Sequence, residues 1–396
     1  MLFEFDSMAE QKAKLKVIGV GGAGGNAVNR MIQAGMQGVD FIVINTDAQD
    51  LENNAAKLKI QIGKNLTKGL GAGAKSDVGR EAVEADREAV QSILEGADMV
   101  FITAGMGGGT GTGAASAVAQ MAKELEILTV GIITLPFNFE GPKRMNRGLG
   151  GLSDLRKSCD TVISIPNQKL MSIVDNNTTV VEAFKLADSI LHQAAKGISD
   201  LINVHGLINL DFADVETIMK NMGEAIMGTG IASGEERAVL AAQQAISSPL
   251  LDSASISGAQ GVLVNITGGP DLTLMEVDEA TSIIFEEAGD DANIIFGAVI
   301  DPRMTEEIRV TVIATGFNQR IPKEVVKETK QFIDIPRQKQ ARILADEENV
   351  PLFNRKISEE DKSSRPSVSK FHFDDTNPVI YGDDIEIPAF IRRQHE

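Results

Sequence analysis

The stretch A-G-M-G-G-G-T-G-T-G, residues 104–113, decides how this chain folds and what it can bind. It follows an apolar run, 99–103, that is typical of a buried strand, and it precedes a periodic stretch, 113–125, that is typical of a helix. A strand, a glycine loop and a helix in this order present backbone amides and a positive helix end to an anion. Because the stretch contains no lysine, we expect amides, the hydroxyls of Thr110 and Thr112, and a metal ion to meet phosphate charge.

Two further glycine-rich stretches follow the same logic. G-V-G-G-A-G-G-N, residues 19–26, follows a predicted strand and opens a predicted helix, and K-G-L-G-A-G-A-K occupies residues 68–75. Three amide-rich loops at the ends of parallel strands can surround a triphosphate. The first stretch also satisfies G-x-G-x-x-G, and Asp47 lies about 23 residues after Gly24, as in dinucleotide-binding proteins. An NAD(P)-dependent oxidoreductase is therefore an alternative.

Strand-like and helical patterns alternate along the first half of the chain. Predicted strands at 15–20, 41–45, 99–103, 129–134 and 162–166 indicate an α/β fold with a Rossmann-like parallel sheet and helices on both faces. We expect an N-terminal extension at 1–14, a nucleotide-binding domain at 15–179 and a long central helix at 180–205. A smaller α/β domain is expected at 206–317, with a helix from about 214 and further elements at 261–267, 274–287, 292–299 and 308–315.

The composition changes after residue 317, where glycine nearly disappears and charge blocks replace periodicity. We predict a flexible linker at 318–380, with a helical patch at 331–348, and a terminal peptide at 381–396. In that peptide Pro388 suits the first position of a short helix, and Ile387, Phe390 and Ile391 share one face. A short apolar helix on a tether is typical of a docking peptide, and the alternative is a frayed terminus.

Composition narrows the class of protein. A net charge of −18 argues against partners that are polyanions, so neither nucleic acid nor a bare membrane surface is expected. No apolar run approaches the roughly 18 residues of a membrane span, so no direct membrane insertion is expected. Cys159 is the only cysteine, which fits a reducing, cytoplasmic location. The histidines lack metal-ligand spacing, so no metal site built from side chains is expected.

Two acids in N-L-D-F-A-D, residues 209–214, are candidates for chemistry. Asp211 and Asp214 lie three apart at the start of a predicted helix and can face the same way. They are either capping and first-turn acids or carboxylates that position water. The sequence offers no Ser–His pair, so a hydrolase of this kind would direct water at phosphorus with electrostatic help.

At this point the motifs carry a resemblance to a known family. G-G-G-T-G-T-G at 107–113 is similar to the hallmark loop of the tubulin and FtsZ superfamily, and V-I-N-T-D-A-Q-D-L, P-F-N-F-E-G-P-K-R, N-L-D-F-A-D-V and D-D-I-E-I-P-A-F-I-R-R-Q resemble bacterial FtsZ motifs in the same order. The resemblance covers about 16–317 and the last dozen residues. It implies a GTPase that assembles head to tail into filaments of the cell-division ring at mid-cell, with GTP or GDP bound and with Mg2+ held mainly by phosphates and water.

The resemblance also assigns roles to positions. It places Asn26 near the guanine, Glu140 and Arg144 at the ribose and phosphates, and Asn167, Phe184 and Asp188 around the sugar and base. The full set of nucleotide-binding residues that it implies is Gly21, Gly22, Ala23, Gly24, Gly25, Asn26, Asp47, Gly71, Ala72, Gly73, Ala74, Gly107, Gly108, Gly109, Thr110, Gly111, Thr112, Gly113, Glu140, Arg144, Asn167, Phe184 and Asp188.

For catalysis and partners the resemblance implies contacts between molecules. Asn209, Asp211 and Asp214 would reach into the nucleotide site of the next subunit, so that hydrolysis waits for assembly. The terminal peptide would bind membrane-tethering and regulatory division proteins through Asp384, Ile385, Ile387, Pro388, Phe390, Ile391 and Arg392.

Overall fold

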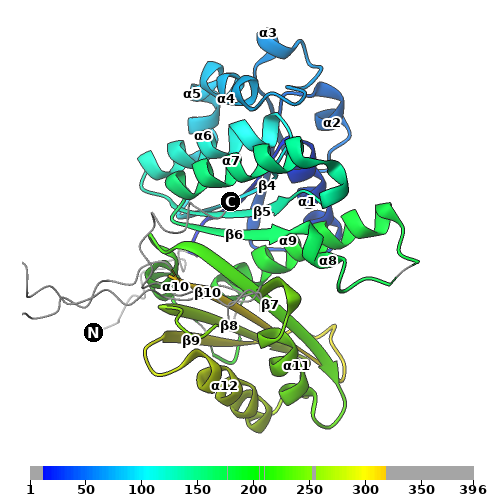
Figure 1. Ribbon diagram of the computed structural model, residues 1–396. Coiled ribbons are helices and arrows are strands. Elements are labelled where there is room, and N and C mark those ends of the chain that lie inside the picture. The colour runs from blue at the N-terminus through cyan, green and yellow to red at the C-terminus, as the bar shows by residue number, and fades with distance from the viewer. Residues whose placement is uncertain (1–11, 176, 205, 209, 252–255, 318–396) are drawn as a thin grey trace, which may run out of the picture. The chain divides into compact units, whose positions relative to one another are not determined.

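The fold is built on one sheet of ten strands, in the order β3-β2-β1-β4-β5-β6-β7-β10-β8-β9 (Figure 1). The computed structural model describes residues 12–317, apart from 176, 205, 209 and 252–255. The predicted linker, the helical patch at 331–348 and the terminal docking peptide lie outside the described residues. Among the helices of the described part, none is both long enough and apolar enough to cross a membrane.

The five strands predicted in the first half match closely, the elements expected at 261–267, 292–299 and 308–315 are also strands, and β3 and β7 were not predicted. The strands are β1 (Leu15–Val20), β2 (Val39–Asn45), β3 (Leu58–Gln61), β4 (Met99–Gly105), β5 (Leu128–Leu135), β6 (Thr161–Pro166), β7 (Gly223–Ser233), β8 (Gly261–Gly268), β9 (Asn293–Ile300) and β10 (Glu307–Thr315). Strands β1 to β6 are all parallel to their neighbours, which confirms the predicted parallel sheet. The sheet becomes mixed beyond β7, because β10 runs antiparallel to both β7 and β8.

The helices cover both faces of the sheet. They are α1 (Gly21–Gln33), α2 (Ala48–Glu52), α3 (Lys64–Thr67), α4 (Ser76–Ala85), α5 (Arg87–Leu94), α6 (Thr110–Glu124), η1 (Asn138–Glu140), α7 (Pro142–Ser158), α8 (Asn167–Leu170), α9 (Val180–Asn203), α10 (Phe212–Met219), α11 (Arg237–Ile246), η2 (Pro249–Leu251) and α12 (Leu274–Ala288).

Alternating side chains divide the core between the two faces. In β1, Val17 joins a cluster with residues of α1, α9 and α10, whereas Ile18 joins a cluster with residues of α4, α5 and α6. A third cluster fills the space between β8, β10 and helices α11 and α12. The first cluster runs from Leu15 to Ile313, so both halves of the sheet contribute to it.

Strand β7 escaped prediction because its glycines hide the apolar pattern. A Cβ at Gly228 or Gly230 would lie 2.0 Å from a backbone oxygen of α11, so only glycine lets this helix pack directly on the strand. β7 joins the two halves of the sheet through a short parallel ladder with β6, over three residue pairs beginning at Thr161↔Gly223.

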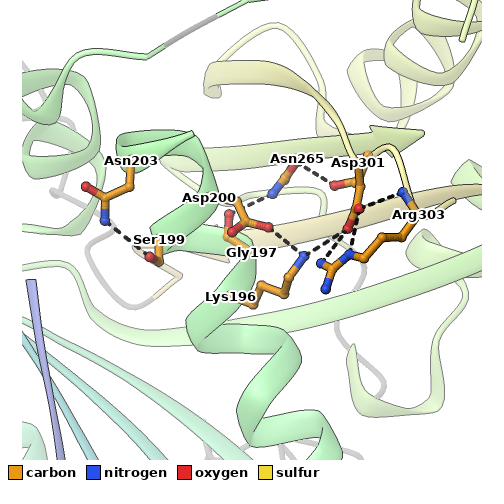
Figure 2. Close-up of polar contacts among 9 residues, drawn as sticks. Lys196, Gly197, Ser199, Asp200, Asn203, Asn265, Asp301 and Arg303 are labelled. Carbon is orange, nitrogen blue, oxygen red and sulfur yellow. Dashed lines mark hydrogen bonds and ion pairs between the residues drawn. The ribbon is translucent and has the colours of Figure 1, made fainter. Parts of the chain in front are cut away.

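The long helix α9 is fixed at both ends. At its start, Thr179 and Glu182 form a capping box, in which each side chain accepts a hydrogen bond from the other residue's backbone N–H. Toward its end the contacts with the neighbouring strands are polar, as Figure 2 shows. Asn265 donates a hydrogen bond to the Gly197 carbonyl at 2.8 Å, and Lys196 lies 2.8 Å from Asp200 and 3.9 Å from Asp301.

Candidate functional site

A cavity of about 380 Å3 opens where the parallel strands end. Strands β1, β2, β4 and β5 each contribute their last residues, and Asn167 follows the last residue of β6. Its lining comprises Val20, Gly22, Ala23, Asn45, Asp47, Asp50, Leu70, Gly71, Ala72, Gly73, Gly105, Met106, Gly108, Gly109, Thr110, Gly111, Thr134, Leu135, Pro136, Glu140, Arg144, Asn167, Phe184, Ala187 and Asp188. Ligands of α/β proteins bind at this position, beyond the carboxyl ends of the parallel strands.

Two helix N-termini meet at the cavity. The glycines predicted as loops form the first turns of these helices, because α1 begins at Gly21 and α6 begins at Thr110. Neither helix has a side-chain cap or an acidic residue in its first turn. The amides of both first turns therefore have no intrahelical acceptor, which makes the two helix ends suited to an anion.

The glycines of the third stretch lie against Gly109, the residue directly before α6. A Cβ at Gly109 would lie 2.4 Å from the Gly73 carbonyl oxygen and 3.0 Å from the Ala72 Cβ. Gly71 and Gly73 both have positive φ, +80° and +60°, which favours glycine. The segment at 71–73 is thus folded directly onto the start of α6, and both line the cavity.

Several predicted residues do not line the cavity. They are Gly21, Gly24, Gly25, Asn26, Ala74, Gly107, Thr112 and Gly113. Some allow close packing instead: a Cβ at Gly24 would lie 2.4 Å from the Thr103 carbonyl oxygen, and one at Gly113 would lie 1.8 Å from that of Ser76. Asn26 lies in a smaller adjoining hollow of about 80 Å3, which shares Gly22, Asn45 and Asp50 with the cavity.

The two threonines have partners within the protein. The Thr112 hydroxyl accepts a hydrogen bond from the Gly107 N–H at 2.9 Å, so it holds the loop in shape. The Thr110 hydroxyl pairs with that of Thr46 at 2.7 Å. Of the two, Thr110 lines the cavity.

The cavity lining also combines an aromatic ring with a buried amide oxygen that has no partner among the described residues. Phe184 packs edge-on against Phe137 and is 40% exposed. Asn167 is buried, and its Oδ1 has no hydrogen-bond partner. Such an atom suits a donor on a ligand, because a buried acceptor without a partner costs free energy. Burial raises the pKa of Asp188 to about 6, and the nearby Arg30 opposes the shift.

Acidic groups outnumber basic ones in the lining. Arg144 is the only cation among the lining residues, and its Nε lies 3.0 Å from the Glu140 carboxylate. Glu140 also accepts the Phe137 N–H. Asp47 caps α2 by accepting the N–H groups of Gln49 and Asp50. A polyanionic ligand here would therefore depend on amides, helix ends and a bound cation.

The predicted catalytic acids lie at the opposite ends of the parallel strands, on the side where these strands begin. Asp211 is the N-cap residue of α10 but makes no side-chain capping bond, and Asp214 lies in the first turn; both are exposed. Asn209 falls outside the described residues. Thr161, the first residue of β6, donates its hydroxyl to the carbonyl of Met219 at the end of α10, whereas Asn167 follows the last residue of β6.

The path of helix α9 also shows that the predicted acids and the cavity lie at opposite ends of the strands. Ala187 and Asp188 line the cavity near its start, and Asn203 at its end bonds the carbonyl of Gly38, just before β2 begins. A helix of 24 residues spans about 36 Å. In Figure 1, α10 lies on the side where the arrow of β6 begins, and α8 lies on the side where it ends. Asp211 and Asp214 thus lie far from the cavity of their own molecule.

Some lining residues were missed from the sequence. Asn45, Gly105, Met106, Thr134, Leu135 and Pro136 all stand at or just after the end of a parallel strand. Their position was available, because the strands themselves were predicted and ligands bind at their carboxyl ends. Asp50 and Leu70 carried no such signal.

Comparisons with known proteins agree with this geometry. Residues 14–175 match the Tubulin/FtsZ family, GTPase domain, and residues 223–318 match the FtsZ family, C-terminal domain. An FtsZ dimer from M. jannaschii, solved empty, is similar at 44% identity with a TM-score of 0.76, over 79% of this chain and 90% of that one. CetZ2 from Haloferax volcanii, solved as a GTPγS-bound protofilament, has a TM-score of 0.64 at 22% identity, over 76% and 92% of the two chains, and so shares the fold.

Proposed function

Because this chain belongs to the tubulin/FtsZ family of GTPases, we propose that it polymerises head to tail and that each GTP is hydrolysed at the junction between two copies. The cavity of one copy would hold GTP, and Asp211 and Asp214 of the next copy would complete the site. Membership of a GTPase family disfavours the oxidoreductase alternative, although Gly19, Gly21 and Gly24 satisfy its motif.

The observation that carries this proposal is the position of the two acids. The cavity lies where the parallel strands end, and the start of α10 lies on the side where they begin. The acids of one copy can therefore meet the cavity of another when copies stack in the same orientation. Such a contact joins unlike surfaces and repeats without closing, which gives a filament. The relatives solved as a dimer and as a protofilament support self-association.

The cavity has groups that suit GTP. The uncapped starts of α1 and α6 and the glycines at 71–73 suit phosphates, while Phe184 offers apolar area and Asn167 Oδ1 and Asp188 offer acceptors to the guanine donors. Mg2+ would be held by phosphate oxygens and water, because no group of three or more His, Cys, Asp or Glu side chains suited to a metal exists among the described residues. The ion would neutralise charge that Arg144 alone cannot.

The remaining roles complete the proposal. Within a filament Asp211 or Asp214 would position or polarise the attacking water, as phosphoryl transfer to water requires. We place the protein in the cytoplasm at the mid-cell division ring, with residues 381–396 as the docking peptide for tethering and regulatory proteins. Residues 15–179, 180–205 and 206–317 would act as the GTP-binding domain, the central helix and the activation domain.

Complementation between two inactive variants tests the shared site. Asp214→Ala should keep its affinity for GTP and lose turnover, and Gly109→Val should lose GTP because its side chain would collide with Gly73. Mixed in equal amounts, the two should regain activity at about a quarter of the junctions, where an intact cavity meets an intact acid pair. Phosphate release measured across protein concentration should also show a threshold.

The control is Gly109→Val combined with Asp214→Ala in one chain, which should restore nothing when mixed with Asp214→Ala. Asp278→Ala, an exposed acid on α12, should behave as the unmodified protein. Turnover by strictly separate molecules, or loss of GTP binding by Asp214→Ala, would contradict a shared site.

A further inference from the structure

A second hollow, of about 510 Å3, lies at the outer edge of the sheet beside the start of β2. β3 pairs with β2 only over the four positions from Ile42↔Leu58 to Asn45↔Gln61. On that side Val39, Asp40 and Phe41 face no strand within the part of the chain that the structure describes. The hollow occupies the place where β3 would continue if it were longer at its start.

The two walls of the hollow differ in character. One wall belongs to the face covered by α1 and is apolar, formed by Ile32, Met36, Val39 and Phe41. The opposite wall belongs to the face covered by α5 and is mixed, formed by Lys16, Asp40, Ile42, Ser92 and Ile93. An added strand would suit this slot if apolar side chains alternated with polar ones.

The hollow carries an excess of positive charge. Lys16 and Lys57 line it against one acid, Asp40, in a chain whose net charge is −18. The Lys16 ammonium group donates to the carbonyls of Ile93 and Glu95, which holds its charge at this edge. An acidic strand would be attracted here.

We propose that residues 3–6 of the same chain, Phe3-Glu4-Phe5-Asp6, occupy this hollow as an additional edge strand. The segment alternates aromatic and acidic residues, so Phe3 and Phe5 would pack on the apolar wall while Glu4 and Asp6 face the opposite wall, which contains Lys16. The backbone groups of β2 that face no described strand would gain hydrogen bonds.

The chain can reach the hollow without leaving its own molecule. Its described part begins at Lys12, the Lys14 N–H bonds Asp98 at 2.7 Å, and Leu15 pairs with Val39 at the start of β2. The seven residue-to-residue steps from Phe5 to Lys12 span up to about 23 Å, whereas the hollow lies about two strand spacings, roughly 10 Å, from β1. The short tether gives the segment a high local concentration.

Covering this edge would also protect it. An exposed strand edge with an apolar wall invites pairing with another chain, and proteins commonly block such edges. The proposal does not depend on the proposed function, because neither the cavity nor the predicted acids take part.

Amide hydrogen exchange on the full chain tests the contact. In Phe3→Ser/Phe5→Ser, the amides of residues 39–41 should exchange faster by on the order of tenfold or more, with other strands unchanged. Lys57→Glu should act in the same direction, and Lys64→Glu on α3 should not. Met8→Ser serves as the control within the N-terminal segment. Unchanged exchange at 39–41 in the double variant would overturn the proposal.

Cross-linking distinguishes the source of the strand. Phe5→Cys paired with Leu58→Cys should form a bridge within single molecules on mild oxidation, since Leu58 lines the hollow and the native Cys159 is buried. Phe5→Cys paired with Leu240→Cys, on α11, should not. Covalent dimers in place of internal bridges would show that another copy supplies the strand and would overturn the proposal.

Discussion

Thr46 and Thr110 join their hydroxyl groups in a buried hydrogen bond of 2.7 Å, although 64 residues separate them in sequence. Thr46 follows β2, and Thr110 is the first residue of α6. The bond therefore ties the second parallel strand to the helix whose start lines the cavity.

Substitutions of Thr110 should distinguish the contribution of its hydroxyl group from that of the size and shape of its side chain. Thr110→Val leaves the Thr46 hydroxyl buried without its partner and should cost about 1–3 kcal/mol of stability and weaken GTP binding, whereas Thr110→Ser should cost less. Adding Thr46→Val to Thr110→Val should recover part of the loss, because the pair is then apolar on both sides. Thermal unfolding and GTP titration measure both effects, and equal behaviour of the Val and Ser variants would contradict this role.

GTP affinity should depend on pH through Asp188. Burial raises the pKa of this carboxyl to about 6, and only its ionised form can accept from both guanine donors. Affinity should therefore fall by about tenfold between pH 7 and pH 5. Asp188→Asn should bind more weakly at pH 7 and lose most of this dependence, which also controls for titration of the nucleotide phosphates.

The same group affects stability in the opposite direction. The folded state holds a proton on Asp188 up to about pH 6, whereas the unfolded chain releases it near pH 4, so this group's contribution falls as pH rises through that window. Unfolding of the nucleotide-free protein should show less of this loss in Asp188→Asn. An identical pH profile for both proteins would show that the carboxyl is not desolvated.

An ion-pair cluster around a buried arginine should stabilise the second half of the sheet. Arg237, whose side chain is 8% exposed, lies 2.6 Å from both Asp271 and Glu276, and its hydrogen bond is the main cause that lowers the pKa of Glu276 to about 2. Arg237→Met leaves two acids without their partner and should lower the unfolding free energy at pH 7 by about 2–3 kcal/mol. Urea titration measures the change.

The pH dependence of that loss follows from the lowered pKa. The stabilisation from Glu276 is present above its unfolded pKa, about 4.5, and disappears as pH falls toward 2, so the variant and the parent should converge there. Arg303→Met removes an exposed arginine from its pair with Asp301 and should cost less than about 1 kcal/mol. A cost for Arg303→Met as large as that for Arg237→Met would mean that burial is not decisive.

Much of the fold was predictable because local pattern and tertiary structure agree. Apolar runs indicated the five strands from 15–20 to 162–166 and three further segments of the second half that form strands, and β1 matches its predicted bounds. Two of the three glycine-rich stretches directly follow strands, β1 and β4, as predicted, whereas the stretch at 68–75 follows α3. Both stretches after strands are partly helical, because α1 begins at Gly21 and α6 begins at Thr110. β7 was missed because its glycines serve a packing contact that sequence periodicity does not contain.

The candidate site was predictable in part, for a similar reason. Residues at strand ends, such as Gly105 and Thr134, line the cavity because parallel strands end there. A search for sequence motifs does not identify such residues. Conversely, Gly24 and Gly113 belong to glycine-rich motifs yet face neighbouring backbone in place of the cavity. The separation of Asp214 from the cavity could not be predicted from spacing, because it depends on the path of α9 along the sheet.

That separation has a consequence for any row of these molecules. If each cavity is completed only by a neighbour's acids, the last molecule on one side keeps an uncovered cavity, and its GTP outlasts the GTP inside the row. The last molecule on the other side presents free acids, and its own cavity is completed by its neighbour. The two tips would then differ in the nucleotide that they hold as well as in the surface that they expose. Molecules would therefore be added and lost at different rates at each tip.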